Sequence, residues 1–243
     1  MRATISSDSW CGSFSASLPN ARAFSSGKRS ASSSKTARRP TGRTWASPTR
    51  KAAERPACFF YISQPTTDYI LIPEVSSERR KYIPIGFMSK DVISANTNCL
   101  VSDPSLYLFG VLTSAMHMAW VRQVGGRLKS DYRYSRTMVY NTFPWPVAPS
   151  ERQRARVEEA AQAVLDAREE WLPKGATLAD LYDRFGMTRE LFKAHHALDR
   201  AVDRCYRAQA FTSDRQRVEL LFALYEKLTA PLLPNEGKKK RRE

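Results

Sequence analysis

The chain has 243 residues, enough for one or two folded domains, and its 39 Lys/Arg against 24 Asp/Glu give a formal net charge of +15. This balance favours nucleic acid or another acidic surface as a partner. The four cysteines form no Cys-x-x-Cys pair, which argues against a zinc site and a disulfide framework and fits a reducing cytoplasm. No apolar run approaches the roughly 18 residues that span a membrane, and we expect no membrane partner.

Residues 1–57 differ in composition from the rest of the chain. They hold eleven Lys/Arg and two Asp/Glu, and Ser, Ala, Thr and Pro dominate without any apolar periodicity. Such a segment cannot bury enough apolar surface to offset its ordering entropy, so we expect disorder. Two alternatives stay open: an organelle transit peptide, whose composition it superficially shares, and an artefact of a misplaced start or a shifted reading frame.

Short runs of aromatic and β-branched residues begin at Cys58 and predict strands. The expected strands are Cys58–Ile62, Tyr69–Ile72 and Tyr82–Phe87, with two shorter ones at Val92–Ile93 and Cys99–Val101. Proline lacks a backbone N–H to donate in a ladder. Pro73 and Pro84 therefore predict edge strands or irregular pairing.

A helix is predicted next, with Asp103 as its cap and Pro104 in its first position. Apolar residues follow at steps of three and four up to Trp120, and the Gly125-Gly126 pair ends the helix. His117 lies beside this apolar stripe, where a packing role is more common than a ligand or base.

The segment after Gly126 alternates basic residues with tyrosines and ends at the rigid Phe143–Pro146 sequence. Guanidinium and ammonium groups neutralise phosphates and reach guanine edges, and tyrosines donate to phosphate oxygens or pack on sugars. The composition therefore indicates a DNA-reading surface. An ordinary solvated loop after a helix is the alternative.

From Ser150 to Pro231 the pattern is helical. The predicted N-caps are Ser150, Thr177, Thr188 and Ser213, the last with a capping box to Gln216. Each helix has one apolar stripe and one charged face, which is typical of a small bundle. The fold class is thus α+β: a disordered N-terminal tail, a small mixed α/β domain at 58–149, a helical domain at 150–232 and a basic tail at 233–243.

Catalytic and metal-binding motifs are missing from the sequence. It has no glycine-rich phosphate loop, no His-Glu-x-x-His and no Gly-x-Ser-x-Gly. The neighbouring His195 and His196 would point about 100° apart on a helix, so we expect His195 to pack and His196 to face solvent. No catalytic residue and no metal site are expected in this chain alone.

Four segments together resemble a known family: Ile72–Phe87, Leu108–Arg122, Gly126–Ser135 and Tyr140–Pro146. They resemble the target-recognition region of MmeI-like (type IIL) restriction–modification DNA adenine methyltransferases. The helical remainder is similar to the C-terminal domain of that family, so that the resemblance runs from Arg55 to Pro231. It implies sequence-specific recognition of double-stranded DNA.

The departures from the family are equally informative. Its full chains carry a nuclease and a methyltransferase domain that binds S-adenosylmethionine and flips adenine toward an Asn-Pro-Pro-Tyr-type motif. None of these is found, and Asn141–Pro144 (Asn-Thr-Phe-Pro) does not match the motif. We therefore expect a C-terminal fragment that is not catalytic alone and has no cofactor of its own. S-adenosylmethionine is implied only for the parent enzyme, whose methyltransferase portion is a further expected partner.

The resemblance also implies site residues. Base readout is assigned to Lys129 and Asp131, which would project the same way from an extended loop. Lysine donates to guanine O6/N7 and aspartate accepts from cytosine N4, so together they would read one G·C pair. A surface ion pair between the two is the alternative. The expected phosphate contacts are Arg79, Arg80, Lys81, Arg127, Tyr132, Arg133, Tyr134 and Arg136.

Two other functions stay open from the sequence: a non-enzymatic helical interaction protein, and a basic RNA-binding protein that acts through its tails. Duplex binding that survives deletion of residues 1–57 and of the Lys238–Arg242 cluster would favour DNA recognition by the folded body.

Overall fold

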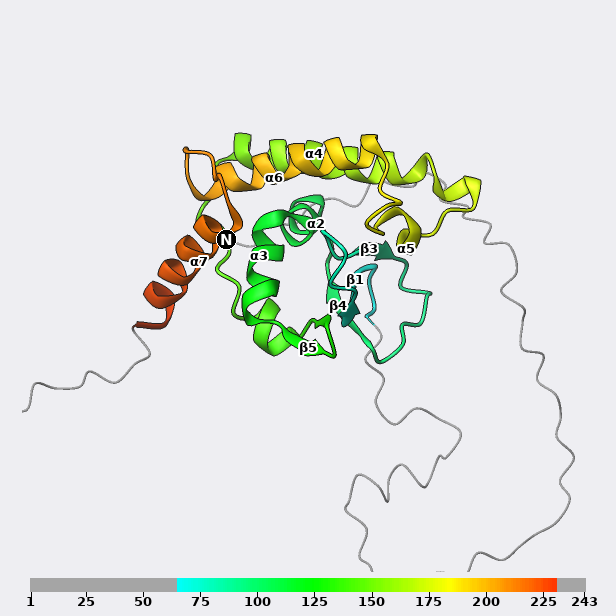
Figure 1. Ribbon diagram of the computed structural model, residues 1–243, viewed down its shortest axis with the longest axis horizontal. Coiled ribbons are helices and arrows are strands. Elements are labelled where there is room, and N and C mark those ends of the chain that lie inside the picture. The colour runs from blue at the N-terminus through cyan, green and yellow to red at the C-terminus, as the bar shows by residue number, and fades with distance from the viewer. Residues whose placement is uncertain (1–64, 231–243) are drawn as a thin grey trace, which may run out of the picture. The chain divides into compact units, whose positions relative to one another are not determined.

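The computed structural model describes residues 65–230 (Figure 1). The expected strand Cys58–Ile62, the expected disorder of residues 1–57 and the basic tail at 233–243 lie outside this range. Small antiparallel sheets and helices make up the described part, so the predicted α+β class is confirmed.

The first sheet has the order β3-β1-β4. Strand β1 (Tyr69–Pro73) lies between β3 (Gly86–Met88) and β4 (Asn98–Ser102), both antiparallel to it. The predicted strands at 69–72 and 99–101 are confirmed. Of the two predicted alternatives for Pro73, the edge strand is wrong, because Pro73 ends the central strand. Its pairing is nevertheless one-sided: the β3 ladder stops at Leu71, so Pro73 lines up only with Asn98 of β4.

Two strand predictions were wrong. Only Gly86 and Phe87 of the predicted strand at 82–87 are in β3, although Tyr82, Ile83 and Ile85 are buried in irregular backbone. Burial without a ladder partner explains why the apolar run alone was misleading. Val92–Ile93 forms no strand, and Ile93 is 79% exposed.

The predicted helix at 103–125 is two helices. Ser105, not Asp103, caps α2 (Leu106–Thr113), accepting from the Leu108 N–H, whereas Asp103 has a φ of 55°. At Ser114 the backbone is extended; its hydroxyl donates to the Val111 carbonyl (2.7 Å) and accepts from the His117 N–H (3.4 Å). One side chain thus ends α2 and begins α3 (Ala115–Val124), whose end at Gly125 agrees with the prediction.

All four predicted helix caps in the C-terminal half are confirmed. The helices are α4 (Glu151–Glu169), α5 (Leu178–Leu181), α6 (Arg189–Tyr206) and α7 (Asp214–Thr229), with a short 3-10 turn, η2, at Leu172–Lys174. The capping box at Ser213 is not completed, because the Gln216 side chain accepts from Thr212 and Arg207 instead.

The C-terminal helices lie directly on the first half of the described chain. In Figure 1, α4 and α6 run side by side across α2, while α7 packs along α3. One buried cluster runs through both halves, from Ile70 and Phe109 to Val157, Leu198 and Leu221. The two halves therefore share one hydrophobic core.

Buried polar groups also join the two halves. Asp199 of α6 accepts from the Tyr82 hydroxyl (2.6 Å) and from the Ala115 N–H at the start of α3 (2.7 Å). Burial raises the pKa of Asp199, and both hydrogen bonds oppose that rise. Arg168 of α4 donates to the Ile85 carbonyl (2.7 Å) and to the Tyr182 hydroxyl.

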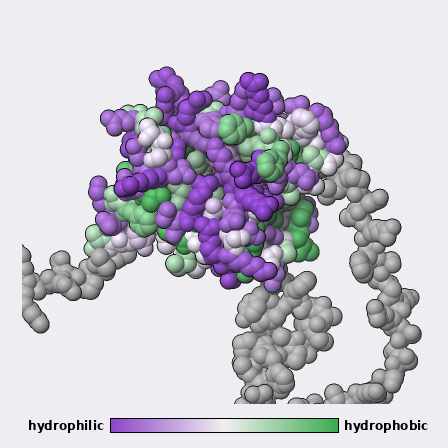
Figure 2. Space-filling view, in the orientation of Figure 1, coloured by the Kyte–Doolittle hydropathy of each residue, from purple (hydrophilic) through white to green (hydrophobic). Residues whose placement is uncertain are grey.

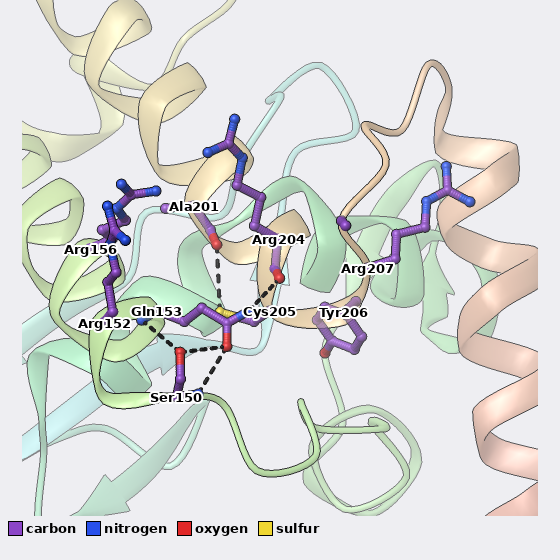
Figure 3. Close-up of a pocket in the computed structure, with 10 residues that line it drawn as sticks. Ser150, Arg152, Gln153, Arg156, Ala201, Arg204, Cys205, Tyr206 and Arg207 are labelled. Atoms are coloured by element: carbon purple, nitrogen blue, oxygen red, sulfur yellow. Dashed lines mark hydrogen bonds between the residues drawn. The ribbon is translucent and has the colours of Figure 1, made fainter.

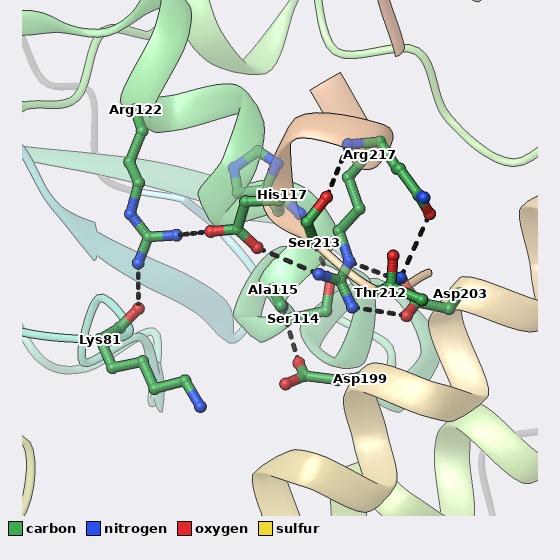
Figure 4. Close-up of polar contacts among 12 residues, drawn as sticks. Lys81, Ser114, Ala115, His117, Arg122, Asp199, Asp203, Thr212, Ser213 and Arg217 are labelled. Carbon is green, nitrogen blue, oxygen red and sulfur yellow. Dashed lines mark hydrogen bonds and ion pairs between the residues drawn. The ribbon is translucent and has the colours of Figure 1, made fainter. Parts of the chain in front are cut away.

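Ion pairs continue these connections toward α7 (Figure 4). Arg217 contacts Asp203 at 2.7 Å with both side chains largely buried, and Arg122 at the end of α3 contacts Asp214 at 2.8 Å. Arg122 also donates to the Lys81 carbonyl (2.9 Å), so it ties the loop after the short strand β2 (Val75–Ser76) to α7. The face in Figure 2 is largely hydrophilic, with its hydrophobic residues in separate patches. None of the helices within residues 65–230 has an apolar stretch long enough to cross a bilayer.

Gly110 marks the closest approach of α2 to α4 and α6. A Cβ there would lie 2.8 Å from Val157 Cγ1, 3.2 Å from Ala161 Cβ and 3.3 Å from Leu198 Cδ1. The first distance is too short for two carbon atoms. Glycine is thus required by packing, against its low helix propensity.

We predict that Gly110→Ala lowers the free energy of unfolding by about 1–3 kcal/mol through overpacking, although alanine is the better helix former. Urea denaturation measures the change. Ala155→Gly, at an exposed position of α4, is the control for propensity alone. A Gly110→Ala variant that is more stable than the native chain would contradict the close packing.

Candidate nucleic-acid interface

The basic segment after Gly126 is a β-hairpin. Strand β5 (Gly126–Leu128) pairs with β6 (Asp131–Arg133), with Arg127 opposite Tyr132 and Leu128 opposite Asp131. Lys129 and Ser130 form the two-residue turn, and Lys129 has a φ of +56°. Turns of this length match the twist of the paired strands when positive φ values are adopted. Lys129 is therefore the exposed tip of the hairpin.

A short strand brings a distant segment beside the hairpin. Strand β2 (Val75–Ser76) pairs with β6, with Val75 opposite Arg133, and gives the sheet order β2-β6-β5. Just after β2, the Glu78 N–H donates to Asp131 Oδ1 at 3.3 Å. The predicted basic clusters at 79–81 and 127–136 are therefore neighbours in space.

The side chains of β6 alternate between two environments. Tyr132 is 8% exposed and faces inward, whereas Arg133 is exposed and Asp131 half-buried on the other side. The Arg127 guanidinium lies 4.2 Å from the centre of the Tyr132 ring and donates to the Ser130 carbonyl (3.2 Å). Tyr132 therefore acts as a support that holds Arg127 in place.

Tyr134 anchors the hairpin to α3. It is 1% exposed, and its hydroxyl lies 3.1 Å from His117 Nε2. His117 in turn meets Phe143 edge-on with ring centres 4.6 Å apart. The predicted packing role of His117 agrees with this geometry. We do not retain Tyr134 among the phosphate contacts, because its hydroxyl is buried and already paired.

Lys129 and Asp131 do not share an extended strand as expected, because Lys129 occupies the turn. Asp131 is held by the Glu78 N–H, whereas the exposed Lys129 side chain contacts no partner within residues 65–230. The alternative ion pair between the two is likewise not formed in this range. Their role in base readout stays a prediction.

The basic residues around the hairpin fall into two groups. Arg79, Arg133 and Arg136 are exposed, with Arg136 opening the short π-helical turn η1 (Arg136–Tyr140). Lys81 differs, since its Nζ lies 3.1 Å from His196 Nε2 and 4.7 Å from the Phe192 ring centre. Burial lowers the pKa of Lys81, which faces α6 and not the hairpin. We therefore separate Lys81 from the exposed arginines.

Possible metal ligands and the two neighbouring histidines were also located. No group of three His, Cys, Asp or Glu able to hold a metal occurs within the described range. His195 is buried, stacks on Tyr82 and lies 2.6 Å from the Tyr182 hydroxyl, whereas His196 is exposed, as predicted for both. The Glu78–Asp131 contact was missed by sequence reasoning, because a two-residue strand has no detectable alternation.

Burial lowers the pKa of His117 from 6.5 to about 3, so this side chain is neutral in the folded protein. The unfolded chain takes up a proton below pH 6.5, which favours unfolding. We predict that lowering the pH from 7 to 5 decreases the free energy of unfolding by about 2 kcal/mol through His117 alone. Denaturant titrations at both pH values should show this decrease in the native chain, and the decrease should be about 2 kcal/mol smaller in His117→Gln. The exposed His196→Gln is the control, and equal pH dependence in both variants would refute the assignment.

Comparison with known proteins gives matches to two family models. The family model "MmeI, target recognition domain" matches residues 15–147, and "MmeI, C-terminal domain" matches residues 148–233. The first match begins well before Arg55, so the family resemblance extends into a segment in which the sequence had led us to expect none.

Two relatives are similar over more than two thirds of this chain. DNA methyltransferase A of Bacillus subtilis (strain 168) is 47% identical over 171 residues, which are 70% of this chain and 19% of that protein. The type IIL restriction-modification enzyme MmeI, solved in complex with DNA, is 49% identical with a TM-score of 0.72, over 77% of this chain and 25% of that one. This chain thus spans a quarter or less of either relative. It belongs to the MmeI family, of which it carries the target-recognition and C-terminal domains.

Proposed function

We propose that this chain recognises a specific DNA sequence as the target-recognition part of an MmeI-like restriction–modification methyltransferase. The observation that carries the proposal is the β2-β6-β5 sheet, which brings basic side chains from residues 79–80 and 127–136 together around one exposed hairpin. Family membership and the solved complex of MmeI with DNA support it. A two-stranded ribbon such as β5–β6 also fits the major groove of B-DNA.

The exposed arginines suit the phosphate backbone. Arg79, Arg133 and Arg136 form no ion pair with an acidic side chain within residues 65–230, so their guanidinium groups are available to phosphates. Arg127 is held on Tyr132 before any ligand binds, which reduces the entropy lost on binding. We propose phosphate contacts for these four residues and for the half-buried Arg80.

Lys129 and Asp131 suit base readout from the tip of the hairpin. Lys129 is exposed and unpaired in the described structure, and its ammonium group would donate to guanine O6/N7. Asp131 uses Oδ1 for the Glu78 N–H, which orients the carboxylate and leaves Oδ2 to accept from cytosine N4. Together they would read one G·C pair.

Methyl transfer is placed elsewhere in the proposed enzyme. S-adenosylmethionine and the adenine-N6 chemistry belong, in this proposal, to a methyltransferase portion that acts with this chain. The motifs for binding the methyl donor and the flipped adenine are not found in the sequence. The contribution of this chain is then to hold that portion at its target sequence.

We predict that the double variant Arg133→Gln, Arg136→Gln weakens binding to duplexes of any sequence alike. Each lost phosphate contact reduces the slope of log K against log salt by about 0.9, so the slope should fall by roughly 1.8. Affinity measurements between 50 and 200 mM NaCl, roughly the range in which this dependence is steep, give the slope. Arg184→Gln, Arg189→Gln on the helical half is the control of equal charge. Identical slopes for the two double variants would exclude the hairpin arginines from the interface.

The charge-reversed pair Lys129→Glu, Asp131→Arg tests base readout. We predict a changed preference at one G·C position of the consensus that the full chain selects from randomised duplexes, at about 1–3 kcal/mol per contact. Thermal unfolding checks that loss of the Glu78–Asp131 bond leaves the fold intact. Ser130→Ala, in the same turn, should select the native consensus. If the reversed pair also selects the native consensus, these residues do not read bases.

A further inference from the structure

A pocket unrelated to the hairpin lies between the first turns of α4 and the last turns of α6 (Figure 3). Its volume is about 550 Å³, within the range of small-molecule sites. Arg152 and Arg156 line it from α4, and Arg204 and Arg207 line it from the end of α6. No Asp or Glu is among its lining residues, all of which belong to the described chain. We call it the arginine pocket.

The charge of the arginine pocket is not compensated. The side chains of Arg152, Arg156 and Arg204 make no ion pair or hydrogen bond within residues 65–230, unlike Arg217, which is paired with Asp203. Arg152 and Arg156 are four residues apart on α4, a spacing at which like charges repel. Arg200 and Arg204 repeat that spacing on α6.

The position of Arg152 and Arg156 near the start of α4 is also unfavourable without a bound anion. The start of a helix carries a partial positive charge, so cations in its first turns are unfavourable and anions are favourable. Arg152 and Arg156 occupy the first two turns of α4, where stability alone would select acidic residues. An anion bound by Arg152 and Arg156 would offset their mutual repulsion and the partial positive charge at the start of α4, whereas Arg204, in the last turn of α6, already lies where a cation is favoured.

The walls of the pocket are fixed by neutral contacts. The Gln153 side chain donates to the Arg204 carbonyl (2.6 Å) and completes the capping box with Ser150, so it joins α4 to α6 beneath the arginines. Arg207 lies 3.6 Å from the Phe211 ring centre and donates to the Ala210 carbonyl (3.1 Å). Arg152, Arg156 and Arg204 are therefore free side chains around a rigid floor.

We propose that the arginine pocket binds a phosphate group. Guanidinium is planar and offers paired donors that match two oxygens of a phosphate. The phosphate belongs either to a DNA backbone outside the bases read by the hairpin or to a small phosphorylated ligand. In Figure 1, β5 lies on the opposite side of α2 and α3 from the α4–α6 pair, so the hairpin does not contact the same phosphate. Only the DNA source rests on the proposed function.

The test uses the full 243-residue chain and the triple variant Arg152→Gln, Arg156→Gln, Arg204→Gln. The control is Arg184→Gln, Arg189→Gln, Arg215→Gln, which removes the same charge from exposed positions outside the pocket. Thermal unfolding is followed with increasing inorganic phosphate or pyrophosphate against sodium chloride at equal ionic strength. Salt slopes for duplex binding are measured in parallel. Arg156→Gln alone is a milder second variant, for which we expect partial loss.

Two results together indicate a small phosphorylated ligand. Phosphate or pyrophosphate raises the Tm of the native and control chains saturably but not that of the triple variant, and the salt slopes for duplex binding are the same in all three proteins. A DNA backbone is indicated if the triple variant loses about 0.9 in slope per contact with unchanged base preference. Equal Tm shifts and equal slopes in the triple variant and its control overturn the proposal. The phosphate arm needs no DNA, so its outcome is independent of whether the hairpin reads bases.

Discussion

The buried carboxylate of Asp199 is the constraint on which the arrangement of the described chain depends. It takes one hydrogen bond from the Tyr82 hydroxyl and one from the Ala115 N–H, at 2.6 and 2.7 Å. A buried acceptor without donors is costly, so the two hydrogen bonds fix α6, the loop at Tyr82 and the start of α3 relative to one another. Because β5 follows α3 directly, the position of the hairpin also depends on this carboxylate.

A surface with the DNA-reading role proposed for the hairpin has to hold its side chains still. Three contacts do this for the hairpin: Tyr134 with His117, Arg127 with Tyr132, and Asp131 with the Glu78 N–H. Each joins the hairpin to itself or to a different element. The rigidity of this surface therefore comes from tertiary contacts, since strands of two or three residues have little stability alone.

Local signals predicted much of the fold, and non-local contacts account for what they missed. The four helix caps and strands β1 and β4 follow from side-chain chemistry within a few residues. The break between α2 and α3 at Ser114 could not be predicted from local sequence, because serine also occurs within helices. Its role here depends on the buried Ala115–Asp199 contact. For the candidate site, the basic residue types were evident, but Lys81 and Tyr134 face α6 and α3, which only the tertiary structure decides.

The left-handed backbone at the hairpin tip limits how this surface can diversify. A φ of +56° at residue 129 is best tolerated by glycine, asparagine and aspartate, and poorly by β-branched side chains. Asp131 lies in regular strand, but its carboxylate also holds the Glu78 turn. Substitution at one position is thus restricted by backbone geometry and at the other by a lost tertiary contact. In the base readout proposed for these two residues, few other side chains could therefore replace either one without a change in the backbone or the loss of a contact.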